Sequence, residues 1–195
     1  MSEYISEEKI KALEVKANEI RQSIISMLVA AGSGHTAGPL GMADIFTAMY
    51  FHVLHHDPKN TELPDRDRLV LSNGHITPVR YAAMAHAGYF PVEELLTLRK
   101  FGTRLQGHPE RERLPGVETT SGPLGSGLGQ AIGMALAARM DKAAWRTYCF
   151  MGDGEQDEGI IWESAMLAGK YRLANLTGII DRNNIQIDGM TEDVM

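Results

Sequence analysis

Two small groups of polar residues each follow a short apolar run near the carboxyl end of the chain. Asp153 lies between two glycines directly after the run Tyr148–Met151, and Asn183 follows the run Leu176–Ile180. Carboxylate and amide oxygens are the ligands that Mg²⁺ or Ca²⁺ prefers, and no Cys or His stands beside them to favour zinc. The glycines allow the backbone to turn sharply and approach a phosphate closely. The pattern predicts a divalent-ion site that anchors a phosphorylated ligand.

The segment between these two groups has the pattern of a helix. Residues Glu155–Leu173 carry apolar side chains at helical spacing, with acidic residues in the first turns. A right-handed strand–helix–strand crossover makes the two strands parallel, so that their carboxyl ends lie at the edge where open α/β sheets bind ligands. We therefore expect Asp153 and Asn183 to lie close together. Taken singly, Asp-Gly and Asn-Asn are ordinary turn residues, and only their shared position indicates a site.

The spacing of these motifs resembles that of a known cofactor-binding family. GDG, then residues 155–182, then Asn-Asn resembles the thiamine diphosphate motif, and the runs GDGEQDEG, LAGKYRLANL and DRNNIQIDG resemble transketolase. The match is to the amino-terminal subunits of split transketolases, and it runs from about residue 10 to the last residue. It implies an α/β fold, a mainly parallel doubly wound sheet with helices on both faces. Residues 1–195 would form one such domain, truncated at its carboxyl end relative to the family.

Three loops each place a histidine directly after a glycine, and all three resemble segments of the family. They are SGHTAGPLG with His35, LSNGH with His75 and QGHPE with His108. A Gly-His turn on its own is more often structural than functional. Histidine can, however, hydrogen-bond a hydroxyl or phosphate group and can move a proton near neutral pH. Three such loops at one sheet edge would form a polar pocket for a hydroxylated, phosphorylated substrate.

The resemblance also implies which residues hold the metal ion and the diphosphate. The magnesium ion, or a calcium ion in its place, would be held by Asp153, Asn183 and the backbone carbonyl of Ile185. The diphosphate would be contacted by His75, Gly154 and Asn183.

Further roles implied by the resemblance concern the cofactor ring and the sugar. The stretch TTSGPLGSGLG resembles the segment that lies against the aminopyrimidine ring. Its ring-lining residues would be Gly122, Pro123 and Leu124. The catalytic residues would be His35 and His108, which would face the sugar, and Glu158, which would couple two sites across a dimer.

The reaction implied is transfer of a two-carbon ketol unit from a ketose phosphate, such as xylulose 5-phosphate, to an aldose phosphate. The family's pyrimidine-binding half and a further Gly-His segment have no counterpart in this sequence. We therefore expect the isolated chain to be inactive and to require a carboxy-terminal, pyrimidine-domain transketolase subunit in a homo- or hetero-oligomer.

Other functions remain open on the sequence alone. The chain could be a non-catalytic module that binds thiamine diphosphate or only assembles with partners. It could also belong to another thiamine enzyme, such as deoxyxylulose phosphate synthase or pyruvate dehydrogenase, although the sugar-facing Gly-His loops favour transketolase. A magnesium-dependent phosphatase is disfavoured because Asp153 has no obvious second acid to complete a nucleophile–acid pair.

Composition narrows the class of protein. The 195 residues are 44% hydrophobic and 23% charged, which is typical of a soluble globular protein. A net charge of −6 with no Lys/Arg cluster argues against a nucleic-acid partner, and no apolar run reaches the roughly 18 residues of a membrane span. The single cysteine, Cys149, excludes an intramolecular disulfide. These features predict a cytoplasmic protein.

The remaining elements are predicted from periodicity and capping residues. Ser6 is expected to cap the first helix, which ends near Ala31. The other predicted elements are helices over Pro39–Leu54, Thr77–Ala87, Phe90–Lys100 and Gln130–Met140 and a strand over Arg68–Ser72.

Overall fold

The computed structural model describes residues 5–195, which form two compact units. The first unit contains residues 5–54 together with Ile76–Gly107, and the second contains His55–His75 together with His108–Met195. Among the described residues, no helix has the length and apolar character needed to cross a membrane.

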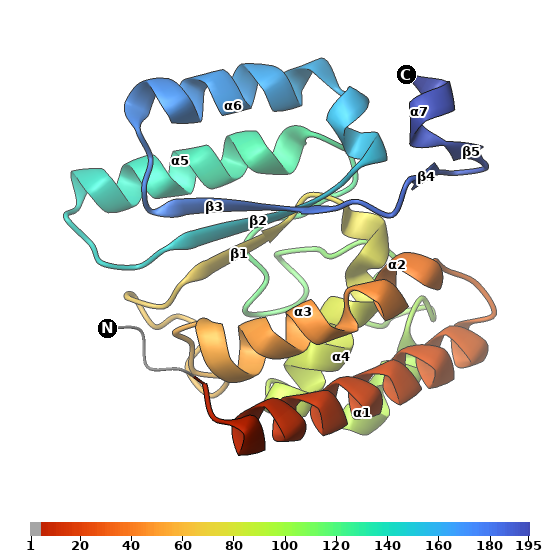
Figure 1. Ribbon diagram of the computed structural model, residues 1–195. Coiled ribbons are helices and arrows are strands. Elements are labelled where there is room, and N and C mark those ends of the chain that lie inside the picture. Colours follow the sequence, from red (N-terminus) through yellow and green to blue (C-terminus); the bar gives the residue numbers. More distant parts are fainter. Residues whose placement is uncertain (1–4) are drawn as a thin grey trace. The chain divides into compact units, whose positions relative to one another are not determined.

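The second unit is built on a parallel sheet of three strands, β1-β2-β3 in spatial order (Figure 1). The strands are β1 (Arg68–Leu71), β2 (Thr147–Gly152) and β3 (Leu176–Asp181). In the register of the sheet, Phe150 pairs with Leu71 on one side, and Gly152 pairs with Asp181 on the other. The three strands therefore end at the same edge, as the strand–helix–strand pattern predicts.

Two helices lie on one face of this sheet (Figure 1). Helix α5 (Ser126–Met140) contacts all three strands, and α6 (Gly159–Tyr171) packs beside α5. Small side chains on α5 permit this close approach. The buried core of this layer contains Val70, Leu128, Ala131, Ile132, Ala135, Cys149, Met151, Ile161 and Leu173. Complete burial of Cys149 in β2 raises the pKa of its thiol, and the nearby charge of Glu155 adds to that effect.

The first unit is helical. Its elements are α1 (Glu7–Ala31), α2 (Ala37–Gly41), α3 (Ala43–Ala48), the π-helical η1 (Met49–Val53), α4 (Thr77–Ala87) and the 3₁₀ helix η3 (Val92–Thr97). Helix α1 packs against α3, α4 and η3. Ser6 caps α1 as predicted, because its hydroxyl accepts a hydrogen bond from the backbone N–H of Lys9 at 3.2 Å. Gly32 ends α1 in the left-handed conformation at φ +65°.

The prediction of one continuous helix over Pro39–Leu54 is wrong. The segment is divided at Met42, which leaves helical geometry with φ −87° and ψ 2°. It then widens at η1, where the N–H of Leu54 donates to the carbonyl of Met49. The wider turn accompanies the burial of Tyr50, whose ring contacts the rings of Phe46 and Tyr89.

The helix predicted over Glu155–Leu173 is also interrupted. A short 3₁₀ helix, η4 (Gly154–Asp157), comes first, and α6 begins only after Glu158, which is extended at φ −76° and ψ 123°. The cause is local, because the carboxylate of Glu155 turns back to the backbone N–H of Gly152 at 3.0 Å.

Smaller differences concern other helix ends and the carboxyl end of the chain. The segment predicted as a helix to Lys100 is the shorter η3, and α5 begins four positions before the predicted Gln130. After β3, the chain forms elements that the sequence did not indicate. They are a two-stranded antiparallel sheet of β4 (Ile185–Gln186) and β5 (Gly189–Met190), followed by α7 (Thr191–Val194).

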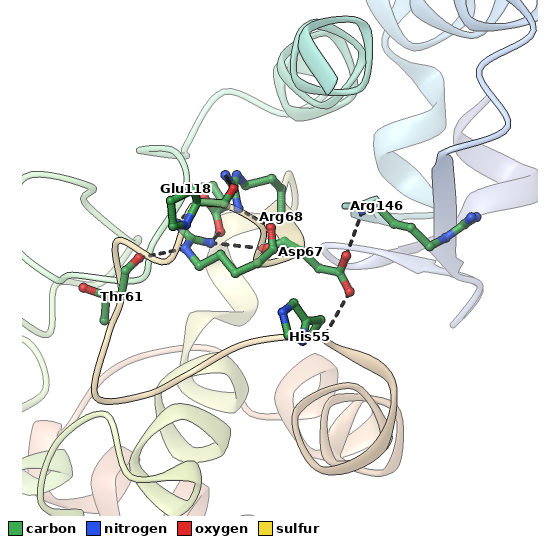
Figure 2. Close-up of polar contacts among 8 residues, drawn as sticks. His55, Thr61, Asp67, Arg68, Glu118 and Arg146 are labelled. Carbon is green, nitrogen blue, oxygen red and sulfur yellow. Dashed lines mark hydrogen bonds and ion pairs between the residues drawn. The ribbon is translucent and has the colours of Figure 1, made fainter. Parts of the chain in front are cut away.

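A network of charged residues supports the amino-terminal side of β1 in the second unit (Figure 2). The guanidinium of Arg66 forms a two-pronged ion pair with Glu118, and their side chains are only 15% and 6% exposed. Asp67 accepts hydrogen bonds from the backbone N–H groups of His55 at 2.9 Å and Arg146 at 2.8 Å. The network thereby joins the start of β1 to the start of β2 and to the segment that leads into the loop before α5.

We predict that Arg66→Met destabilises the protein by about 3 kcal/mol, because it leaves the Glu118 carboxylate buried without its ionic partner. Urea unfolding at neutral pH measures this loss. Arg113→Met is the matched control, since the Arg113–Glu110 pair is 51% and 40% exposed and should contribute about 0.5 kcal/mol or less. Equal losses in the two variants would contradict the prediction.

A mostly buried histidine lies between two helices of the first unit. His86 of α4 has its Nε2 at 2.9 Å from the Ser23 hydroxyl of α1, and its side chain is 13% exposed. Burial lowers the pKa of His86 below its ordinary value of 6.5, and the charge of Lys16 lowers it further while Glu19 opposes the shift. The folded state therefore favours neutral His86.

This pKa shift makes stability depend on pH in a defined direction. Because the unfolded chain takes up a proton near pH 6.5 and the folded chain does so only at lower pH, stability falls as the pH drops below about 6.5. The loss stops once the pH has passed the lower, folded-state pKa. We predict that His86→Gln shows a shallower decrease in unfolding free energy from pH 7 to pH 5.5 than the wild type. Identical slopes in denaturant titrations would count against this assignment.

Candidate functional site

Three loops of the second unit meet where the parallel strands end. Residues Ser72–His75 follow β1, Gly152–Gly154 close β2, and Asp181–Asn184 close β3. Backbone hydrogen bonds continue the sheet into these loops. The N–H of Ser72 donates to Phe150 O at 2.9 Å, and the N–H of Asp153 donates to Asp181 O at 3.1 Å.

Asp153 is the carboxylate at the centre of this edge. It is buried, and its Oδ1 accepts a hydrogen bond from the N–H of Gly154 at 2.9 Å. Its Oδ2 accepts a hydrogen bond from the N–H of Asn184, which adopts a left-handed backbone conformation at φ +66°. The expectation that the GDG loop and the asparagine loop lie close together is confirmed by this contact.

The other two proposed metal ligands lie beside Asp153 along the chain that follows β3. The side-chain oxygen of Asn183 accepts from the N–H of Ile185 at 3.0 Å, and its amide donates to Asp181 at 3.3 Å. Both Asn183 and Ile185 are exposed. A Cβ at Gly154 would lie 2.9 Å from Cγ of Gln186, so this segment passes too close to the GDG loop for a larger residue at position 154.

The oxygen atoms of this edge suit a hard divalent cation that is only partly coordinated by protein. Residues 5–195 contain no cluster of three or more His, Cys, Asp or Glu side chains arranged to hold a metal ion. One carboxylate, one amide oxygen and one backbone carbonyl would instead hold an ion whose remaining ligands are water and phosphate. That arrangement is typical of Mg²⁺.

Two of the three Gly-His loops meet in the second unit. A Cβ at Gly74 would lie 2.3 Å from Oγ of Ser121 and 3.1 Å from Cδ2 of His108, so the loop carrying His75 touches both. His75 is half-buried, and His108 is exposed. The third histidine, His35, belongs to the first unit, where it follows α1 and is likewise exposed.

The predicted ring-binding segment, Gly122–Leu124, runs into a tight turn before α5. Gly125 adopts φ +83°, and a Cβ there would lie 2.5 Å from Cγ2 of Ile160 and 3.1 Å from Cβ of Glu158. The turn therefore packs against the start of α6, and Glu158, an exposed residue, lies next to it.

Several buried polar atoms around these loops have no hydrogen-bond partner among residues 5–195. They include Oδ1 of Asn73, Oγ1 of Thr119, Oγ of Ser121 and Oε1 of Gln186. Buried polar atoms are rarely left without a partner. Asn73 lies in the loop after β1, a Cβ at Gly74 would meet Ser121, and a Cβ at Gly154 would meet Gln186. These three atoms therefore lie around the strand ends, which fits a site for a polar ligand such as a diphosphate.

Glu155 is the site residue that the sequence did not reveal. It is 2% exposed, and its carboxylate accepts hydrogen bonds from the Ser72 hydroxyl and from the N–H groups of Gly125 and Gly152. It stands in a run of acids with Asp157 and Glu158, and no feature of that run distinguishes it. Acids after a strand end are expected at a helix start, where they are usually exposed.

A separate groove in the second unit lies away from these residues. It has a volume of about 680 Å³ and is lined mainly by apolar side chains of α6 and β3. Its described lining includes none of the predicted site residues and no group of polar side chains that could perform chemistry. The candidate site is therefore the sheet edge.

The second unit is a parallel α/β sheet whose strand-end loops offer oxygen ligands, glycine amides and histidines. This arrangement is typical of enzymes that bind a phosphorylated cofactor at the edge of the sheet. The family model described as "Transketolase, thiamine diphosphate binding domain" matches residues 13–195. The chain belongs to the transketolase family and has its thiamine diphosphate-binding fold.

Individual relatives agree with this assignment. The chain is 45% identical to the 6-deoxy-6-sulfo-D-fructose transketolase subunit SqwG of Clostridium sp. (strain MSTE9), with 97% of this chain and 69% of the relative covered. It is 42% identical to one subunit of the apulose-4-phosphate transketolase of Phocaeicola vulgatus, with coverages of 96% and 66%. The solved transketolase of Campylobacter jejuni superposes with a TM-score of 0.89 at 38% identity, covering 95% of this chain and 30% of that one. The chain thus spans about two thirds of the length of these two relatives.

The close packing of α5 against β1 gives a prediction for two glycines of the same helix. In Gly127→Ala, the new Cβ would lie 2.4 Å from Cβ and 2.7 Å from Cα of Ser72, so we expect a loss of about 1–3 kcal/mol. In Gly133→Ala, the matched control, the new Cβ would meet nothing within 4 Å. This substitution should stabilise the helix by about 0.5–1 kcal/mol. Thermal or urea unfolding measures both changes, and two changes of the same sign would contradict the prediction.

Proposed function

We propose that the chain is the diphosphate-binding subunit of a transketolase that transfers a two-carbon ketol unit between phosphorylated sugars. The observation that carries this proposal is the contact between the buried Asp153 carboxylate and the Asn184 backbone at the shared strand edge. That contact joins the two halves of the cofactor motif. Membership of the transketolase family supports the class of reaction.

The metal ion and the diphosphate would occupy the strand-end loops. Asp153, Asn183 and the carbonyl of Ile185 would hold Mg²⁺, which would bridge to the diphosphate, as Mg²⁺ commonly does. His75 and the backbone of Gly154 would donate hydrogen bonds to the diphosphate oxygens. The absence of a side chain at Gly154 lets the backbone come close to a phosphate.

The remaining predicted residues would orient the cofactor and the sugar. Thiamine diphosphate, when bound, supplies the reactive carbon and the electron sink needed to break a carbon–carbon bond. His35 and His108 would hydrogen-bond the sugar hydroxyls and accept or donate their protons. The segment Gly122–Leu124 would lie against the pyrimidine ring, and Glu158 would connect the site to a second site across a subunit interface.

A complete active site would need further polypeptide. The two named bacterial relatives are transketolase subunits, and this chain covers 69% and 66% of them. We infer a partner subunit that binds the pyrimidine half of the cofactor, within a homo- or hetero-oligomer. The names of these relatives refer to different sugars, 6-deoxy-6-sulfo-D-fructose and apulose 4-phosphate. The donor of this enzyme therefore has to be found by assay.

Magnesium-dependent cofactor binding is the first test. Thiamine diphosphate is titrated calorimetrically into the chain, alone and with a candidate partner subunit, in the presence and absence of Mg²⁺. We predict that Asp153→Ala lowers the magnesium-dependent affinity about tenfold or more, because it removes the only charged protein side chain proposed as a ligand for the ion. Asp141→Ala, which removes an exposed acid at the far end of α5, is the matched control and should bind like the wild type.

The same proteins distinguish the proposed function from its alternatives. Two-carbon transfer is assayed with xylulose 5-phosphate, 6-deoxy-6-sulfo-D-fructose, apulose 4-phosphate and pyruvate as donors. Activity with a sugar donor supports a transketolase, and activity with pyruvate alone would assign another thiamine enzyme. Cofactor binding without turnover in any reconstituted complex would indicate a binding module.

A further inference from the structure

A single buried carboxylate joins three loops that the proposed function assigns to different parts of the cofactor. Glu155 lies in η4 and is 2% exposed. Its Oε1 accepts from the Ser72 hydroxyl and from the N–H of Gly125 at 2.5 Å. Its Oε2 accepts from the N–H of Gly152 at 3.0 Å. One side chain thus holds the loop after β1, the turn before α5 and the end of β2.

The hydrogen-bond donors around Glu155 require an acceptor on both of its oxygens. The two backbone N–H groups can only donate. Oγ of Ser72 accepts from the N–H of Gly127 at 3.1 Å, and its own hydrogen atom is directed to Glu155. An ionised carboxylate satisfies all of these donors, whereas an amide would turn an N–H group against a backbone N–H in either orientation.

The turn before α5 and the start of α5 pack closely at two glycines, where a side chain would collide with a neighbour. A Cβ on Gly127 would collide with Ser72, and a Cβ on Gly125 would collide with Ile160. The spacing of the loops is therefore set by contacts to backbone and by hydrogen bonds, and Glu155 supplies the hydrogen bonds that link all three. Charged hydrogen bonds of this kind are stronger than neutral ones.

We propose that Glu155 is a positioning residue that fixes the distances between the metal-binding, diphosphate-binding and ring-binding loops. This inference rests on the proposed function. Asp153 is two residues before Glu155, His75 is three residues after Ser72, and the ring-binding segment ends at Leu124, directly before Gly125. An extended, rigid cofactor that contacts all three loops binds tightly only if their separation matches its length. Glu155 itself does not touch the cofactor.

Amide hydrogen exchange of the full-length chain tests the positioning role without any cofactor. In Glu155→Gln, at least one of the N–H groups of Gly125 and Gly152 should exchange about tenfold or more faster than in the wild type, because glutamine keeps only one of the two acceptor oxygens. The amides in the middle of β2 should keep their protection, and Glu112→Gln, a change at an exposed glutamate, should alter none of them. Unchanged exchange at both glycines would overturn the proposal.

A second variant covers the possibility that Glu155→Gln loosens the whole unit. Ser72→Ala leaves the two backbone donors of Glu155 in place but removes the acceptor of Gly127. Exchange should then accelerate at Gly127 and remain slow at Gly125. A uniform loss of protection from amide exchange across β2 in both variants would show that Glu155 only stabilises the core of the unit. That result would overturn the positioning role.

Cofactor titration then separates this inference from the proposed function. With Mg²⁺ and the partner subunit present, Glu155→Gln should raise the Kd for thiamine diphosphate about tenfold or more. Its KM for the sugar, measured at saturating cofactor, should match that of the wild type. A variant that binds the cofactor like the wild type would overturn the inference alone. A wild-type complex that binds no thiamine diphosphate would overturn the proposed function.

Discussion

The parallel pairing of β2 with a neighbour on each side is the constraint on which the rest of the second unit depends. Because Phe150 pairs with Leu71 and Gly152 pairs with Asp181, residues that are far apart in sequence reach one edge together. Beyond the strand ends, the loops are held by hydrogen bonds between one another, such as those from Ser72 and Gly125 to Glu155. The register of a buried central strand cannot shift without exposing its core face. The position of the site is therefore fixed by the packing of β2.

The burial of Glu155 shows how such loops can be held together. An isolated carboxylate loses much hydration free energy on burial, and hydrogen bonds must offset that loss. Here Ser72, Gly125 and Gly152 all donate to it. The same charge adds to the rise in the pKa of the Cys149 thiol, which keeps that thiol protonated within the strand. A charged group in the core is thus tolerated where it organises the backbone of several loops at once.

The sequence predicted the strands of the sheet and the proximity of the loops at their ends. It indicated less about the exact ends of the helices and the interruptions within them. Apolar runs and glycines were sufficient for β1, β2 and β3, and Ser6 and Gly32 mark the ends of α1. Periodicity could not reveal the interruption at Met42, because both sides of it have helical spacing. It also could not reveal the role of Glu155, because its hydrogen bonds come from backbone groups at distant positions in the sequence.

Some residues at the edge depart from local conformational preference where its loops approach one another. Gly127 lowers the helix propensity of α5 near its start, yet any larger residue would collide with Ser72. Asn184 and Ile187 adopt left-handed conformations at φ +66° and +55°, which for a β-branched residue such as Ile187 costs about 1–2 kcal/mol. Natural proteins depart from local preference most often at functional sites. Gly127, Asn184 and Ile187 lie around the strand ends, so these departures agree with placing the site at this edge rather than in the apolar groove along α6.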